Sequence, residues 1–401
     1  MSDVEYAYPG LSSKIVSGGR EIDRLGSHLD ALRARRVMVI CGPNILRSSD
    51  VVHRVERAAG DRLVCRFADV APHSPIDVLR AALIVARREQ PDTVISVGGG
   101  STVTIAQGLA LLLSTSRDLS DFAMRFEPPD RVLPPLAQLP EVTTRVIAIP
   151  TTMGGAEIGH AVGGFANERR SHKIIVSGDG RTSPRIVIVD GQALRTTPRA
   201  VQVGTAMGQL RVAIEAYAST AHNPMSDALA LHAIRTLGFT LQGEWTNDED
   251  RLLRIKGACM LASMGQSAMG MGAGKLGVNS AIAHQLGAIC DLAHGEANSI
   301  LLPHTITFNS RALNKRFRLI AEAMGVSRAG RDVEDVAQDV AKRVTLLSTG
   351  LGVPIRLRDV GVSPESFEQI AIATLRDSSI ATNPVPITSK AQIIQLLQEA
   401  W

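Results

Sequence analysis

The sequence predicts a two-domain fold, with an open and mostly parallel α/β sheet domain followed by an all-α domain. The 401 residues are 45% hydrophobic and 20% charged, a composition that allows large cores and excludes a disordered or fibrous chain. In the first half, short β-rich apolar runs alternate with stretches of helical period, and after about residue 198 the strand pattern stops. We therefore place the N-terminal domain at residues 1–194 and the C-terminal domain at residues 195–401.

The strands of the first domain are continuous apolar runs rather than alternating ones. Such runs are typical of a parallel sheet that helices cover on both faces. The predicted strands are Val37–Cys41, Leu63–Phe67, Thr93–Val97, Val146–Ile149 and Ile186–Val189, and the helices between them include Ile76–Arg88 and Val103–Leu113.

The segment from Arg117 to Thr144 interrupts this alternation. It contains five prolines, at positions 128, 129, 134, 135 and 140. Because proline removes a backbone donor, we expect an insertion loop here, with no strand of its own, at the rim of a cleft.

The second half shows helix start signals. Asn223 before Pro224 and Ser363 before Pro364 are typical N-caps, and Ser389 with Gln392 forms a capping box. The helical stretches are Ala206–Ser219, Ser226–Trp245, Arg251–Met269, Val333–Ser348 and Ser366–Leu375.

Composition and charge exclude several classes of protein. The 43 basic residues nearly balance the 39 acidic ones, and aromatic residues make up only 3%, so we expect no nucleic-acid partner. The four cysteines form no CxxC pair, which is typical of reduced thiols rather than a disulfide framework or zinc ribbon. Neither a signal core nor an apolar run of about 18 residues is present, so we expect a cytoplasmic protein without membrane contact.

A glycine loop follows the third strand. The sequence runs from Thr93 through Gly98, Gly99, Gly100 and Ser101 into a helix. Glycines let a backbone approach a pyrophosphate, and a helix N-terminus offers free N–H groups to it. The alternative is a purely structural turn.

A second loop, after the next strand, favours ligand binding. Pro150, Thr151, Thr152, Met153 and Gly154 place hydroxyls and a glycine beyond a strand's carboxyl end. Ligands bind at that edge in open α/β sheets, so two such loops predict a nucleotide cleft.

With further motifs, these loops resemble the iron-containing (group III) alcohol dehydrogenase superfamily, which includes the metal-free maleylacetate reductases. The matching segments are Pro184 to Asp190, Ala213 to Tyr217, Ala283 to Gly287, His294 to His304, and Asn383-Pro384. The resemblance covers almost the whole chain and implies the fold shared with dehydroquinate synthase. It implies an N-terminal domain that binds NAD or NADP through Gly98–Ser101, Thr151 and Thr152, and a catalytic helical domain.

The superfamily's metal ligands are mostly missing. Gly208 stands where the resemblance places an Asp, Val212 and Ser280 stand where it places two histidines, and only His294 remains. Gly and Val supply no donor, and stable sites need three or more N, O or S ligands. We therefore expect no metal.

The departures resemble the maleylacetate reductase branch. Glu157 follows Thr152 at the shorter spacing of that branch, and His284 and His294 lie ten positions apart as they do there. The branch usually has Asn and His at positions 208 and 212 and a further histidine pair at positions 279 and 280, so the substrate itself is not fixed by the resemblance.

Without a metal, a general acid must stabilise the developing alkoxide. Free histidine has a pKa of about 6.5, so we predict that His284 or His294 donates the proton. The alternative is that both are packed structural residues. Arg211 is a candidate for a substrate carboxylate, against an exposed ion pair with Glu215.

Three further predictions concern the substrate and the cofactor. Met153 is a second candidate substrate contact, and Lys173 is placed by the resemblance at the cofactor ribose, against a plain surface lysine. Gly42 replaces an acid common in NAD-preferring relatives, so NADP is permitted, with Arg47 nearby.

The predicted function is a metal-independent, NAD(P)H-dependent reduction of a small oxo- or unsaturated acid by a homodimer. The alternatives are a non-redox lyase or isomerase, and a catalytically silent ligand-binding homologue on the same scaffold.

Overall fold

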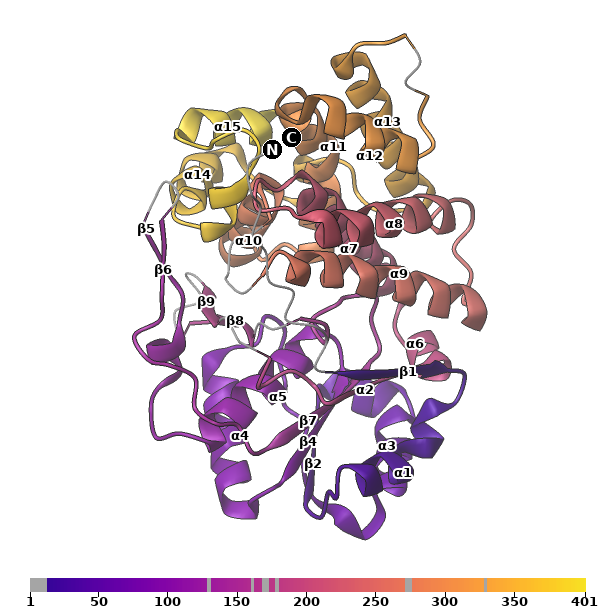
Figure 1. The fold of residues 1–401 in the computed structure, drawn as a ribbon, viewed down its shortest axis with the longest axis vertical. Helices are drawn as coiled ribbons and strands as arrows, with labels where there is room; N and C mark the ends of the chain where they lie inside the picture. Colours follow the sequence, from indigo (N-terminus) through magenta and orange to yellow (C-terminus); the bar gives the residue numbers. More distant parts are fainter. Residues whose placement is uncertain are drawn as a thin grey trace.

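The computed structural model describes residues 13–127, 131–159, 162–167, 173–176, 180–270, 276–327 and 330–401. The N-terminal part is built on a six-stranded sheet in the order β1-β10-β7-β4-β2-β3, with every neighbouring pair parallel (Figure 1). Its strands are β1 (Lys14–Gly18), β2 (Val37–Cys41), β3 (Leu63–Phe67), β4 (Thr93–Gly98), β7 (Arg145–Pro150) and β10 (Ile186–Asp190). The predicted fold class is confirmed, although β1 escaped the sequence analysis.

Helices cover both faces of the sheet. On one face, Val37 and Val39 of β2 pack in a core with α1 (Leu25–Ala31) and α3 (Val51–Ala59). On the other, Met38 and Ile40 pack with α4 (Ile76–Glu89) and α5 (Gly100–Leu113). The remaining helices of this part are α2 (Pro43–Ser48) and α6 (Gly191–Arg195). Burial on both faces is the physical reason why the strands are continuously apolar.

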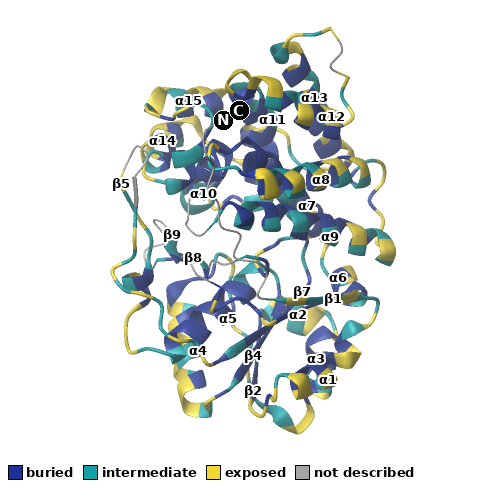
Figure 2. Ribbon diagram, viewed as in Figure 1, coloured by how far each residue is buried: buried dark blue, intermediate teal, exposed yellow. Residues whose placement is uncertain are grey.

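In the C-terminal part, the described residues form helices and connecting loops, without strands. Its helices are α7 (Arg199–Ala218), α8 (Pro224–Thr240), α9 (Glu249–Ala268), α10 (Val278–Cys290), α11 (His294–Leu313), α12 (Phe317–Ala323), α13 (Val333–Gly350), α14 (Phe367–Thr374) and α15 (Lys390–Glu399). Figure 2 shows the buried residues concentrated in the sheet and along the inner helices. The predicted domain boundary falls at the end of α6 and stays a prediction.

The predicted caps at Asn223 and Ser389 are both capping boxes. Ser363 instead begins a short 3-10 turn, Pro364–Ser366, before α14. The predicted extension of α8 to Trp245 is wrong. The helix ends at Thr240 because Gly243 turns the chain with φ 75° and the Trp245 indole donates to Gln202 Oε1 at 2.8 Å.

The prediction that residues 117–144 form a loop without a strand is also wrong. This segment contains a 3-10 turn, Leu119–Phe122, and an antiparallel hairpin of β5 (Arg125–Glu127) and β6 (Arg131–Leu133). All five prolines lie outside the two strands, and Phe126 packs against the core of the C-terminal part. A second unpredicted hairpin pairs β8 (Gly163–Ala166) with β9 (Lys173–Val176).

Candidate active site

The two predicted phosphate loops meet at the carboxyl edge of the sheet. Gly98 ends β4 opposite Pro150, which ends β7, and the Thr151 N–H donates to the Gly98 carbonyl at 2.9 Å. Gly98 has a φ of 143°, a conformation that side-chain-bearing residues rarely adopt. The loops are thus joined to each other as well as to the sheet.

The N-terminus of α5 is open to a ligand. Gly99 is its N-cap and provides no side-chain cap, so the first N–H groups of the helix keep their capacity to bind an anion. A Cβ on Gly99 would lie 3.1 Å from Thr152 Cγ2, so a larger residue would press on the Thr152 side chain. Gly99, Gly100, Ser101 and Thr152 are half-buried. An uncapped helix start beside glycines is the type of site that binds a phosphate group.

The predicted substrate contact Met153 and the predicted cofactor contact Lys173 have different outcomes. Met153 is fully buried in the core, where its N–H donates to Thr205 Oγ1 at 3.1 Å, and it does not line the pocket described below. Lys173 begins β9, but its side chain lies outside the described residues, so its ribose contact stays a prediction.

The structure brings His284 and His294 together. Their rings are stacked with centroids 5.5 Å apart and planes 9° apart. His284 lies on α10, and His294 is the first residue of α11. Both are half-buried and line one pocket.

His284 has a carboxylate partner that sequence reasoning missed. Its Nδ1 lies 2.7 Å from Asp377 Oδ2, which also accepts from Gln285 Nε2 at 3.2 Å. Burial opposes ionisation of Asp377, but the charge and hydrogen bond of His284, with hydrogen bonds from Ser379, hold its pKa below the usual range. Asp377 therefore orients the imidazole and leaves Nε2 as the ring nitrogen for a substrate.

Residues from the N-terminal part form the opposite wall of the pocket. Pro72, His73 and Pro75 follow β3, and Ala166 ends β8. A wider hollow adjoins the pocket at His284 and Ala288, and Arg125 and Arg376 line it. His73 was missed because no other candidate residue lies near it in the sequence.

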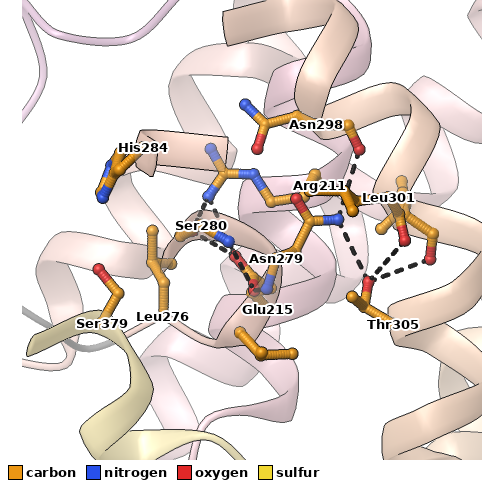
Figure 3. A network of polar contacts seen from close by, with 12 residues as sticks. Arg211, Glu215, Leu276, Asn279, Ser280, His284, Asn298, Leu301, Thr305 and Ser379 are labelled. Carbon is orange, nitrogen blue, oxygen red and sulfur yellow. Dashed lines mark hydrogen bonds and ion pairs between the residues drawn. The ribbon is translucent and has the colours of Figure 1, made fainter. Parts of the chain in front are cut away.

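Arg211 forms a buried polar cluster one helical turn from His284 (Figure 3). Its Nη1 donates to Glu215 Oε2 at 3.1 Å and to the Ser280 hydroxyl. Ser280 Oγ donates to Glu215 Oε2 at 2.5 Å, and Glu215 Oε1 accepts from the Asn279 N–H at 2.9 Å. The predicted pairing with Glu215 is present, but Arg211 is only 5% exposed rather than on the surface, and it does not line the pocket.

Comparison with known proteins identifies the family. Residues 12–191 match "Iron-containing alcohol dehydrogenase", and residues 202–401 match "Fe-containing alcohol dehydrogenase family, C-terminal". The 1,3-propanediol dehydrogenase of Klebsiella pneumoniae is 30% identical over 374 residues, 92% of each chain. The chain belongs to the iron-containing alcohol dehydrogenase family.

Other members of the iron-containing alcohol dehydrogenase family are also similar to this chain in sequence and structure. The lactaldehyde reductase of Escherichia coli (strain K12) is 29% identical over 84% of each chain. The crystal structure of a 1,3-propanediol oxidoreductase has a TM-score of 0.85 and 28% identity over 99% of each chain. The family is one of NAD-dependent alcohol and aldehyde oxidoreductases.

The residues at the metal positions that the resemblance implies do not fit an ion. Gly208 and Val212 bring no donor, and the Ser280 hydroxyl is already bound by Arg211 and Glu215. The Arg211 guanidinium, a permanent cation, contacts one of the four positions. Across the described ranges, no three His, Cys, Asp or Glu residues are grouped so that they could hold a metal.

Over the described part of the chain, no helix combines the length and apolar character needed to cross a bilayer.

Proposed function

We propose that this family member is a metal-independent, NAD(P)H-dependent reductase of a small oxo- or unsaturated acid, similar in reaction to the maleylacetate reductases. The observation that carries the proposal is the Asp377–His284 pair, stacked on His294 in a pocket between the two parts of the chain. The family membership supports the oxidoreductase chemistry and the nicotinamide cofactor.

The glycine loop, Gly98 to Ser101, and the threonine loop, Pro150 to Gly154, together form the proposed dinucleotide site, called here the cofactor cradle. Gly99, Gly100 and Ser101 would hold the pyrophosphate at the start of α5, with Thr152 beside them. Bound nicotinamide supplies the hydride that reaches the substrate carbon.

His284 is the proposed proton donor. The pKa of Asp377 lies below the usual range, so Asp377 is an ionised partner whose carboxylate accepts the Nδ1 hydrogen of His284. The Nε2 proton then passes to the substrate oxygen as hydride arrives at carbon, so a C=O bond becomes CH–OH and His284 is left neutral. His294, parallel to it, contacts the same pocket and limits the space for water.

The decisive experiment measures the cofactor and metal together. Native mass spectrometry and elemental analysis of the purified protein are combined with separate titrations of NADH and NADPH. We expect dinucleotide binding without stoichiometric iron or zinc. Stoichiometric metal required for turnover, or no affinity for either dinucleotide, contradicts the proposal.

The role of the histidines needs its own measurement. With a turned-over substrate, H284N and H294N should each lower kcat by about 10²–10⁴-fold. H53N is the matched control, because His53 lies on α3 and pairs with Glu56 outside the pocket. Unchanged kcat in both pocket variants would refute the assignment.

A further inference from the structure

A third histidine shares the pocket of His284 and His294. His73 lies in the loop between β3 and α4, so it reaches the pocket from the N-terminal part, whereas the other two imidazoles belong to the helical part. Among the residues that the structure describes, the other side chains lining this pocket are Pro72, Pro75, Ala166, Ala283, Ala288 and Asp291, with Gly287. Apart from the three imidazoles, none of these side chains can donate a hydrogen bond to an anion at neutral pH.

The backbone that carries His73 is unusual. His73 and Ser74 have φ values of 66° and 51°, two consecutive left-handed residues without glycine, between two prolines. Residues in this region are strained and persist only where neighbouring contacts hold them. Asn, Asp and His tolerate the conformation better than other side chains do.

Neighbouring strands and helices hold the loop in this shape. The Ala166 N–H, at the end of β8, is shared between the His73 and Ser74 carbonyls at 3.2 Å each. Ser74 is 3% exposed, and its hydroxyl donates to the Ser101 carbonyl in the glycine loop at 3.5 Å. The loop therefore has a fixed position relative to both the cofactor cradle and the pocket.

We propose that His73 is a substrate-contacting residue that binds a carboxylate of the substrate while His284, stacked on His294, serves the reacting oxygen. The inference rests on the proposed function and names its substrate class: a small acid with a carbonyl or conjugated carbon within reach of its carboxylate. An imidazole N–H donating to a carboxylate is a charge-assisted hydrogen bond, roughly twice as strong as a neutral one. The Asp291 carboxylate lines the same pocket and repels anions, so an acid is held at the His73 wall rather than beside Asp291.

The experiment measures binding by calorimetry, with the protein saturated with NADH. The probes are oxamate, malonate, succinate and fumarate, each paired with its neutral diamide, and none of them requires turnover. We expect at least one carboxylate to bind at least about tenfold more tightly than its amide, which is about 1.4 kcal/mol.

The test variant is H73N, because asparagine keeps the left-handed backbone and the loop fold. It should weaken the bound carboxylate by about tenfold while leaving the amide and NADH dissociation constants unchanged. H53N should match the parent protein, and H73G, which relaxes the backbone, should behave as H73N.

Two results overturn the inference: equal carboxylate affinity in H73N and the parent protein, or no carboxylate bound by the parent protein. Failure of the proposed function is seen separately, as loss of NADH binding. In that case the same titrations without NADH still decide whether His73 binds the acid.

Discussion

At the residue scale, the pairing of His284 with Asp377 gives a prediction about turnover. D377N removes the carboxylate that accepts the Nδ1 hydrogen and orients the ring, so kcat should fall by about 10²–10⁴-fold. NADH affinity should not change, because Asp377 lies outside the cofactor cradle. A loss of NADH affinity with kcat intact would contradict this role.

The same pair gives a pH dependence of stability. The folded-state pKa of Asp377 lies below the ordinary 3.8, so its contribution is present above about pH 3.8 and is lost as pH falls through the lower folded value. Urea unfolding of the parent protein and D377N should therefore show a constant difference at neutral pH that shrinks in acid. A difference that grows below pH 3.8 would exclude a low folded pKa.

The Arg211 cluster predicts what prevents a metal from binding at the positions that the resemblance implies. G208D/V212H/S280H supplies the ligand types that the resemblance implies, but the Arg211 guanidinium still lies against position 280 and should repel a divalent ion. Adding R211A should produce stoichiometric zinc binding. Position 208 accepts a Cβ, because a Cβ on Gly208 meets nothing within 4 Å.

Zinc content and calorimetry check this prediction. The matched control is R211A alone, which should bind no zinc. Equal zinc affinity with and without Arg211 would show that the guanidinium does not decide metal exclusion.

Sequence reasoning found some of these residues and missed others for a physical reason. His284 and His294 were found because they lie ten residues apart within recognisable motifs. Asp377 lies 93 residues beyond His284, and His73 lies in another domain, so only the folded chain brings them together.

At the element scale, α7 and α11 cross where both carry glycine. A Cβ on Gly295 would lie 2.6 Å from the Gly204 backbone, so G295A must push the start of α11, with His294, away from α7. We expect a loss of about 1–3 kcal/mol in unfolding free energy and lower kcat. Urea denaturation and steady-state kinetics measure both.

The control is G257A, within α9, where a Cβ meets nothing within 4 Å. It should be neutral or stabilise the protein by up to about 1 kcal/mol, because alanine favours helix. Equal destabilisation of both variants would refute the packing argument.

The elements that could be predicted from the sequence are those whose hydrophobic pattern directly reflects which of their faces are buried. Both faces of β2 and β4 are buried, so their apolar runs were recognisable. The short hairpin of β5 and β6 is stabilised instead by contacts such as Phe126 against the distant C-terminal core, which no local pattern reveals.

At the scale of the whole molecule, a buried ion pair connects the end of the threonine loop and the residues after it to the helical part. Lys256 of α9 donates to Glu157 Oε1 at 2.5 Å and to the Gly154 carbonyl, and its side chain is completely buried. K256M leaves the Glu157 carboxylate buried without a partner, so the unfolding free energy should fall by about 3–5 kcal/mol.

The double variant E157L/K256M is the control, since it removes both charges and should lose much less stability. Denaturation in urea compares the two. If the double variant is as unstable as K256M, packing rather than charge accounts for the effect.

The two stacked imidazoles sit on either side of a three-residue reversal, Asp291 to Ala293, that begins with a left-handed Asp291 at φ 53°. So short a connection gives α10 and α11 little freedom to tilt separately. If the two parts of the chain move relative to each other, His284 and His294 move together, while His73 moves with the sheet. Such a motion would change the distance between the proposed carboxylate-binding residue, His73, and the proposed proton donor, His284, and would leave the stacking of His284 on His294 unchanged.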